Sequence, residues 1–360
     1  MYQDYGYFAT KNSLELMVRR AGLFSQTQQE IAHRVYSSVI RFLSLRKAGI
    51  NCGFPRFKSF NRMKSLRYPQ NGFLISKDGK KLRVTPFGGI KLKLHRPIEG
   101  RVKTLTLKRE ASGKWFAIFT AETPITPYKI NEGPVVGIDL GLRSFAVISD
   151  GTIIKNPRHF KKYEKKLKSL QRRLSRKRLF SHNRNRERLR LAKTHEKTAN
   201  ARSDFLHKLS TYLVNKYSLI ALEDLSIKEM AQEKYGKSIH DAGWSSFLNM
   251  VRSKAESAGC MIMFVDPSNT TQECSNCGAT VRKLLKDRKH YCPRCGIFLD
   301  RDLNASLNIL KRATTGHVVS NACRIASADG GATMKQEALH PLGMGACHVT
   351  LKYGNIMHYN

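Results

Sequence analysis

The chain has 360 residues, of which 64 are Lys or Arg and 27 are Asp or Glu, so its formal net charge is +37. At about 150 residues per domain this length predicts two or three folded units, and 41 % hydrophobic residues exclude a disordered or collagen-like chain. So large a positive charge indicates a polyanionic partner, most often nucleic acid. No apolar run approaches the roughly 18 residues of a membrane span, and residues 1–10 show no secretory signal, so we expect a cytoplasmic protein without a membrane partner.

The first 130 residues predict a helical segment followed by a β module. Residues 12–48 carry apolar side chains at helical spacing, and the pattern breaks at Gly49. Residues 53–73 interleave basic, aromatic and proline residues, which is typical of a loop. From 82 to 123, short alternating runs separated by Gly or Pro predict a small antiparallel barrel or sheet.

The next part of the chain alternates apolar runs with basic helices. Residues 135–139 and 145–148 predict a β-hairpin. Residues 155–208 hold 20 Lys or Arg against four Asp or Glu, with Leu at helical spacing, and predict two long basic helices that turn near 181–185. Further strands are expected at 219–222 and 261–265, helices at 245–258 and 302–311, and an aperiodic tail after about 313.

Four of the eight cysteines form two Cys-x-x-Cys pairs separated by 14 residues, namely Cys274 with Cys277 and Cys292 with Cys295. A glycine follows each pair, so each sits in a tight turn whose backbone N–H groups can face thiolates, and four sulfurs suit tetrahedral Zn²⁺. A closed four-thiolate site leaves no position for water, and we therefore expect a structural zinc ion. Unligated thiols or a redox pair are less favoured, because neither pair opens a helix after a strand.

Three carboxylates have apolar neighbourhoods. Asp139 ends the run 135–138, Glu223 ends the run 219–222, and Asp302 opens a helix. A buried acid needs a cation beside it, and Mg²⁺, or alternatively Mn²⁺, prefers oxygen ligands. Two such ions held by three acids would activate a water and stabilise the leaving oxygen of a phosphodiester.

Each of these acids alone has an ordinary explanation. Asp139 would be a turn residue, Glu223 a salt-bridge partner of the basic helices, and Asp302 a helix N-cap. On strand, strand and helix in that order, they favour an RNase H-like nuclease. Asp224 and Asp300 are near-duplicates of two of them, and which carboxylate points inward is a question of register. Residues 137–141 also resemble the first phosphate loop of actin- and chaperone-type ATPases, but no second phosphate loop or adenosine-binding Gly-Gly segment follows.

Six motifs in order resemble the TnpB proteins of insertion sequences, which are small relatives of type V CRISPR effectors. They are Gly-Phe-Pro-Arg-Phe-Lys-Ser (53–59), Gly-Ile-Asp-Leu-Gly (137–141), Leu-Glu-Asp-Leu (222–225), Thr-Gln-Glu-Cys-Ser-Asn-Cys-Gly (271–278), Tyr-Cys-Pro-Arg-Cys-Gly (291–296) and Asp-Arg-Asp-Leu-Asn-Ala-Ser (300–306). The resemblance runs from about residue 25 to 312, so we expect the opening strand and helix of such proteins to be missing.

The resemblance implies a multidomain α/β fold: an RNase H-like (RuvC) nuclease core with an inserted zinc ribbon, preceded by a helical lobe and a small wedge-like β-barrel. The corresponding ranges are 1–50 for a partial helical recognition lobe, 51–133 for the wedge-like module, 134–270 for RuvC-like parts I and II with a basic helical insertion at 155–215, 271–299 for the zinc ribbon, 300–312 for RuvC-like part III and 313–360 for the tail. Asp139, Glu223 and Asp302 fall on the family's catalytic acids, and Cys274, Cys277, Cys292 and Cys295 on its zinc ligands.

By the same resemblance, the chain is expected to be a transposon-encoded, RNA-guided, Mg²⁺-dependent DNA endonuclease and a monomer. Its partners would be a guide RNA from the element's end, double-stranded target DNA and, as a further candidate, the element's separate transposase. Expected nucleic-acid contacts are Arg56, Lys58, Tyr68, Gln70, Arg172, Arg173 and Arg176. The alternatives are a catalytically silent or truncated nucleic-acid-binding protein, either a transposase accessory or an RNA-guided DNA occluder, and a guide-free junction-resolvase-like nuclease.

Overall fold

The computed structural model describes residues 24–56, 62–94, 96–123, 131–232, 235–284, 287–315 and 347–352. Its internal contacts divide the chain into two compact units, Met1–Ile125 with Lys335–Asn360, and Thr126–Met334. Within the described ranges, no helix is both long enough and apolar enough to cross a membrane.

Two antiparallel sheets form the β part of the first unit. One has the strand order β1-β5-β6-β14 and the other β2-β3-β4. Buried residues of both sheets form one shared core, built from Tyr68, Leu82, Val84, Leu92, Leu105, Ala117 and Phe119. The strands are β1 (Ser65–Tyr68), β2 (Phe73–Ile75), β3 (Lys81–Val84), β4 (Gly88–Lys91), β5 (Arg101–Arg109), β6 (Trp115–Glu122) and β14 (Cys347–Lys352). Antiparallel strands are thus present where the alternation at 82–123 predicted them.

Helix α2 (Ser25–Lys47) occupies most of the helical segment predicted at 12–48, and residues 12–23 lie outside the described part. Gly49 follows the helix at φ +75°, a conformation that ends helices. The first half of the helix is tied to β1, because Arg34 Nη1 donates to the Ser65 carbonyl at 3.3 Å. Beyond that contact its apolar residues Val35, Ile40 and Leu43 are exposed.

Strand β14 departs from the aperiodic tail expected after residue 313. Cys347–Lys352 pairs antiparallel with β6 over six residues, from Cys347 opposite Ala121 to Lys352 opposite Phe116. Six residues carry too weak a periodic signal to be recognised alone, since the pairing partner lies more than 220 positions away in the sequence. Residues 316–346 and 353–360 lie outside the described part of the chain.

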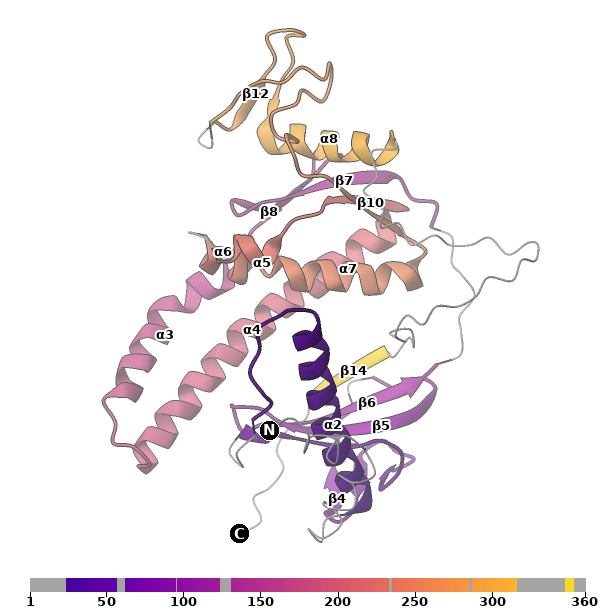
Figure 1. Ribbon diagram of the computed structural model, residues 1–360, viewed down its shortest axis with the longest axis vertical. Coiled ribbons are helices and arrows are strands. Elements are labelled where there is room, and N and C mark those ends of the chain that lie inside the picture. Colours follow the sequence, from indigo (N-terminus) through magenta and orange to yellow (C-terminus); the bar gives the residue numbers. More distant parts are fainter. Residues whose placement is uncertain are drawn as a thin grey trace, which may run out of the picture. The chain divides into compact units, whose positions relative to one another are not determined.

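The second unit is built around a five-stranded sheet with the order β11-β10-β7-β8-β9 (Figure 1). Strands β7, β8 and β9 are antiparallel neighbours, whereas β10 runs parallel to both β7 and β11. The hairpin and the two later strands agree with the sequence prediction, and β9 is an addition to it. Their bounds are β7 (Val135–Leu140), β8 (Ser144–Ile148), β9 (Ile153–Lys155), β10 (Leu219–Glu223) and β11 (Met261–Val265).

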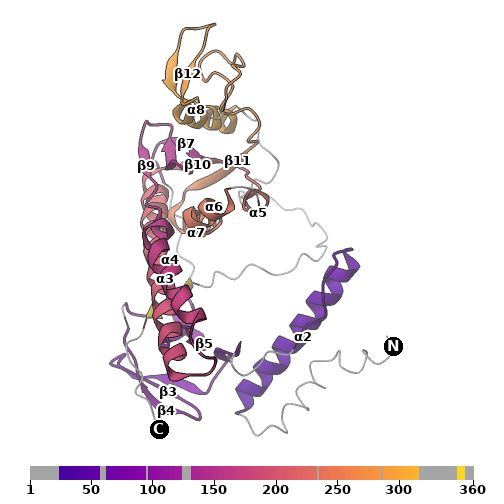
Figure 2. The same ribbon diagram turned by 90° about the vertical axis from the view of Figure 1, so that its left-hand side faces the viewer.

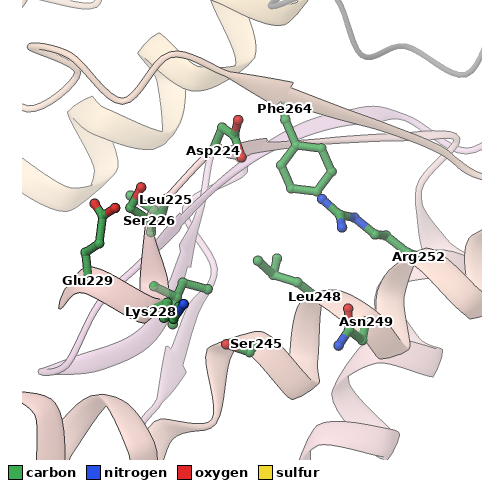
Figure 3. Close-up of a pocket in the computed structure, with 11 residues that line it drawn as sticks. Asp224, Leu225, Ser226, Lys228, Glu229, Ser245, Leu248, Asn249, Arg252 and Phe264 are labelled. Carbon is green, nitrogen blue, oxygen red and sulfur yellow. The ribbon is translucent and has the colours of Figure 1, made fainter. Parts of the chain in front are cut away.

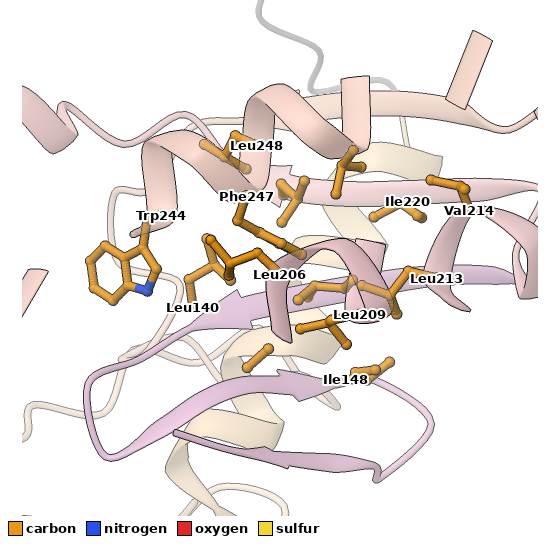
Figure 4. Close-up of a cluster of buried hydrophobic side chains, with 14 of the residues drawn as sticks. Leu140, Ile148, Leu206, Leu209, Leu213, Val214, Ile220, Trp244, Phe247 and Leu248 are labelled. Carbon is orange, nitrogen blue, oxygen red and sulfur yellow. The ribbon is translucent and has the colours of Figure 1, made fainter. Parts of the chain in front are cut away.

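Helices α4 and α7 cover one face of this sheet (Figure 4). The core there joins residues of β7, β8 and β10 to Leu206, Leu209 and Leu213 of α4 (His182–Lys216) and to Trp244 and Phe247 of α7 (Trp244–Ala258). Burying this much apolar surface is the main term that holds the helices on the sheet.

Helix α8 (Arg301–Thr314) covers the opposite face, where Ile309 and Ala313 pack on Ala221 of β10 and Val265 of β11. The helix backbone comes so close to β7 that residue 137 must be glycine: a Cβ there would lie 2.2 Å from the Ser306 carbonyl oxygen. Gly137 therefore makes room for a helix, which is a different role from that of a phosphate-binding loop.

The basic segment forms a helical hairpin of α3 (His159–Ser175) and α4, which lie side by side in Figure 1 and overlap in the turned view of Figure 2. Their connection, residues 176–181, falls just before the turn predicted at 181–185. The remaining elements are α5 (Ile227–Met230), α6 (Gly236–Ala242), β12 (Lys289–Tyr291) and β13 (Phe298–Asp300), and the last two form a hairpin in the cysteine segment.

Candidate functional site

Asp139 and Glu223 lie on neighbouring strands and point to the face that α8 covers. Successive residues of a strand point to opposite faces. Ile138 and Leu222, which pair across β7 and β10, belong to the core under α4 and α7. The next residue on each strand therefore points toward α8, which brings the two carboxylates together near the carboxyl ends of both strands.

Asp302 reaches the same place from the first turn of α8. The neighbouring Asp300 is the N-cap, and its Oδ1 accepts a hydrogen bond from the backbone N–H of Asp302 at 3.0 Å. A capping carboxylate satisfies one of the free N–H groups at a helix start. The Asp300 carboxylate is therefore used to cap α8, and the Asp302 carboxylate remains available to the candidate site. On β10 the register turns Glu223 toward α8 and leaves Asp224 exposed. The cap and the register therefore favour Asp302 over Asp300 and Glu223 over Asp224 as acids of the candidate site.

The charges of these acids act on one another. Burial raises the pKa of Asp139 well above 3.8, and the carboxylates of Glu223 and then Asp302 raise it further. Burial also raises the pKa of Glu223, although a hydrogen bond from the Thr270 hydroxyl at 2.5 Å opposes this. A cation among these carboxylates would remove their repulsion, and a donor set of oxygens alone is what Mg²⁺ prefers.

Thr270 lies beside Glu223 in the candidate site, and the sequence did not reveal it. It is 2 % exposed, its hydroxyl bonds Glu223, and its carbonyl accepts from Asn308 Nδ2 at 2.9 Å. Asn308 and Asn304, four residues apart on α8, both donate to the Glu273 carbonyl at 2.7 Å. The available signal in the sequence was the spacing of four between these two asparagines, which places them on one face of α8.

The four cysteines predicted as metal ligands converge. The Sγ atoms of Cys274, Cys277, Cys292 and Cys295 all lie within 4.8 Å of one another. Sγ of Cys274 is 3.6 Å from that of Cys295, and Sγ of Cys277 is 3.5 Å from that of Cys292. Sulfurs around tetrahedral Zn²⁺ with bonds of about 2.3 Å are separated by about 3.8 Å, so the cluster needs little adjustment to hold the ion.

Backbone turns prepare these sulfurs for a cation. Gly278 and Gly296 follow the pairs at φ +73° and +72°, a conformation in which the chain folds back over the thiols. A hydrogen bond from the Ile297 backbone lowers the pKa of Cys295 to about 6. The Ala279 backbone lowers the pKa of Cys277, but desolvation and the other three cysteines raise it to about 11. A cation held among the four sulfurs would balance the charge of their thiolate forms.

Of the predicted nucleic-acid contacts, Arg172, Arg173 and Arg176 are exposed on the α3–α4 hairpin. Arg173 Nη2 also bonds Glu187 Oε1 at 2.9 Å, so part of its guanidinium serves the hairpin itself. In the first unit Arg56 and Gln70 are exposed, and Lys58 lies outside the described residues.

The prediction that Tyr68 contacts nucleic acid is wrong. Its side chain is fully buried in the core between the two sheets of the first unit, and its hydroxyl donates to the Thr85 carbonyl at 2.8 Å. The residue ends β1, and the strand's alternation turns it inward. Its basic and proline-rich surroundings in the sequence concealed this alternation.

A separate cleft lies between the end of β10, β11, α5 and α7 (Figure 3). Asp224, Leu248, Arg252 and Phe264 line it, and the Arg252 guanidinium lies 4.3 Å from the centre of the Phe264 ring. Phe264 and Leu248 belong to the core on the α4 and α7 side of the sheet. The cleft is therefore on the opposite face from Asp139 and Glu223 and is not part of the acid site.

Comparison with known families gives two matches. Residues 118–234 match the family OrfB_IS605, described as "Probable transposase". Residues 244–309 match the family described as "Cas12f1-like, TNB domain", and this range contains all four clustered cysteines and Asp302.

Curated relatives match over most of both chains. The "Putative RNA-guided DNA endonuclease InsQ" of Escherichia coli K12 is 31 % identical over 301 residues, which cover 79 % of this chain and 73 % of the relative. The "Putative RNA-guided DNA endonuclease" of Streptomyces pristinaespiralis is 31 % identical over 294 residues, 79 % of this chain and 72 % of the relative. Cas12f1, in a solved complex with single guide RNA and target DNA, is similar in fold, with a TM-score of 0.53 at 18 % identity, covering 84 % of this chain and 75 % of that one. With this identity and coverage, and with its six motifs in order, the chain belongs to the TnpB (OrfB) family.

Proposed function

We propose that this chain is an RNA-guided DNA endonuclease that hydrolyses phosphodiester bonds with Asp139, Glu223 and Asp302. One observation carries the proposal: acids from three distant segments meet on one face of the sheet, close enough for Glu223 and Asp302 to raise the pKa of Asp139. The sheet supports an RNase H-like, RuvC-type core, because three antiparallel strands are followed by two parallel ones in the order β9-β8-β7-β10-β11.

We infer the partners from the relatives and from charge. Two relatives are named as RNA-guided DNA endonucleases, and the Cas12f1 structure of similar fold contains guide RNA and target DNA. The net charge of +37 attracts the negatively charged phosphates of a nucleic-acid backbone. On this proposal base pairing with the guide selects the sequence, and the protein holds the duplex by its shape and charge.

The proposal also assigns a role to each part of the described fold. Helix α2 belongs to a recognition lobe, and the two sheets of the first unit form the wedge-like module. Strands β7 to β11 supply parts I and II of the nuclease core, the cysteine segment with β12 and β13 is the zinc ribbon, and α8 is part III.

Asp139, Glu223 and Asp302 would hold Mg²⁺. When bound, Mg²⁺ supplies a reactive water at neutral pH and neutralises charge on the phosphate. Thr270 fixes one oxygen of Glu223 through its hydrogen bond, and Asn308 holds the Thr270 backbone in place. Both are positioning residues, since they fix the orientation of an acid without themselves meeting the phosphate.

The cysteine cluster would hold structural Zn²⁺ and steady the same site. Ser275, between two of the cysteines, donates its backbone N–H to Asn304 Oδ1 at 3.0 Å. Asn304 stands on α8 two residues after Asp302, so the cysteine turn and the helix that carries the acid are directly linked. We infer that zinc fixes the start of α8 and takes no part in the chemical step.

The proposal is tested by cleavage of a plasmid library in which one guide-matched site is flanked by random bases. The protein is co-expressed with the RNA of its element's end, Mg²⁺ is supplied, and Asp139→Ala is the control. We expect cutting that depends on the flanking bases and disappears in the control. Co-purified RNA without cutting would overturn the nuclease in favour of a DNA occluder, and cutting without RNA would favour a guide-free resolvase.

A further inference from the structure

The tip of the α3–α4 hairpin presents an aromatic side chain to solvent. Phe180, in the connection between the helices, is 94 % exposed, and the adjacent Leu179 is 63 % exposed. Phe180 also has φ +64°, a left-handed conformation that residues with bulky side chains rarely adopt. Neither burial nor backbone preference explains a phenylalanine at this position.

The connection is held in this conformation by its own hydrogen bonds. Ser181 caps α4 by accepting from the backbone N–H of Arg184 at 3.1 Å, and its hydroxyl donates to the Arg178 carbonyl at 2.8 Å. The Arg184 guanidinium crosses the turn and donates to the carbonyls of Leu174 at 2.9 Å and Lys177 at 3.1 Å. The ring is thus displayed from a fixed turn, which lowers the entropy that a contact through it would cost.

The surroundings of the ring are almost entirely positive. From Arg172 to Lys193 the hairpin carries ten Lys or Arg and one acid, Glu187. That acid is 4 % exposed and is bonded to Arg173 at 2.9 Å and Arg190 at 2.8 Å. No negative charge of the hairpin tip therefore faces solvent, and the tip attracts a polyanion.

We propose that Phe180 stacks on an exposed base of a nucleic-acid strand while Arg176, Lys177 and Arg178 contact the flanking phosphates. A nucleic acid offers both of the surfaces that this tip complements, a flat aromatic face and a row of phosphates. The inference rests on the nucleic-acid binding of the proposed function and deepens it, but it requires neither cleavage nor a guide.

The test measures binding of the full chain to a single strand of about 12 nucleotides, as RNA and as DNA, with 2-aminopurine at the central position. Phe180→Gly is the main variant, because glycine accepts the left-handed conformation and the turn should fold at least as well. We expect it to weaken binding of at least one strand by about tenfold and to abolish the stacking-induced quenching of 2-aminopurine.

Two further variants separate stacking from charge. Phe180→Trp should restore affinity and quenching, whereas Leu179→Ala, the matched neighbour, should change neither. Arg176→Gln should reduce the slope of log affinity against log salt by about one, while Phe180→Gly leaves that slope unchanged.

Parental affinity of Phe180→Gly for both strands would overturn the inference. Failure of Phe180→Trp to restore binding would also overturn it, because any stacking surface should serve.

The same variants are tested on anionic phospholipid vesicles and by sedimentation. A Phe180-dependent signal in either assay, with strand binding unchanged, would assign the tip to a membrane surface or to a second copy of the chain. Absence of plasmid cleavage together with a Phe180 effect on strands would contradict the proposed nuclease and leave this inference intact.

Discussion

Gly137 and Ser306 are in such close contact that a Cβ on residue 137 would lie 2.2 Å from the Ser306 carbonyl oxygen and 2.6 Å from the backbone nitrogen of Leu310. Both obstacles are backbone atoms of α8 and cannot move without the helix. The strand that carries Asp139 and the helix that carries Asp302 are therefore brought together through a residue with no side chain.

Gly137→Ala should push α8 away from β7, lower stability by about 1–3 kcal/mol and slow cleavage by displacing Asp302. Thermal unfolding and cleavage rate measure the two effects. Gly89→Ala is the control, because a Cβ at residue 89 meets nothing within 4 Å. An unchanged melting temperature for Gly137→Ala would contradict the close packing.

Neighbouring acids should differ sharply in their effect on cleavage. Glu223→Gln and Asp302→Asn should each slow cutting by at least about a hundredfold, because each removes a negative charge from the proposed metal site. Asp224→Asn should leave the rate nearly unchanged, and so should Asp300→Asn, since asparagine caps helices as well as aspartate does. An Asp224 variant as inactive as the Glu223 variant would show that the register at the end of β10 had been misread.

Loss of one clustered cysteine should release the metal and weaken the fold. Cys277→Ser is expected to lower the zinc content from about one ion per chain and to bring thermal unfolding to a lower temperature. Elemental analysis and melting curves give the readout. Cys52→Ser, a cysteine outside the cluster, should alter neither, and a Cys277 variant with full zinc and an unchanged melt would refute the assignment.

Asp150 should contribute stability that depends on pH. Burial raises the pKa of Asp150, but hydrogen bonds from Tyr217 at 2.6 Å, Thr152 at 2.9 Å and Lys216 at 3.1 Å outweigh it and hold the pKa far below 3.8. The folded state therefore binds the proton less readily than the unfolded state. Its contribution is complete above about pH 4 and is lost as the pH falls below that value toward the folded pKa.

Asp150→Asn should thus be about 1 kcal/mol less stable than the parent at pH 7, with a difference that shrinks below about pH 4. Denaturant unfolding at several pH values measures it. Asp204→Asn is the matched control, because its carboxylate is exposed and pairs only with Lys208 one helical turn away among the contacts described. A difference for Asp150→Asn that stayed constant down to pH 2 would contradict the assigned ionisation.

The sequence predicted those elements whose residues carry their own signal. Apolar runs ending at Asp139 and Glu223 marked β7 and β10, because a strand between two covered faces reads as a continuous apolar stretch. The spacing of the cysteines also indicated the metal cluster, because two ligands of a four-thiolate site come from each short Cys-x-x-Cys turn.

Other features depend on partners distant in the sequence and carry little local signal. Strand β14 is defined by its pairing with β6, and the three-residue strand β9 is defined by its pairing with β8. Thr270 lies in a loop, and only the tertiary fold brings its hydroxyl to Glu223. Tyr68 was misjudged because a basic, proline-rich neighbourhood is typical of exposed segments, whereas its burial follows from the pairing of β1 with β5.

The sheet register also sets an order of events during synthesis. Leu219 pairs with Val135, 84 positions earlier, and the whole α3–α4 hairpin lies between them. The basic hairpin therefore leaves the ribosome before Glu223, and well before α8 delivers Asp302. On the proposed function, a nascent chain therefore presents its basic surface for nucleic acid before its three-acid site is complete.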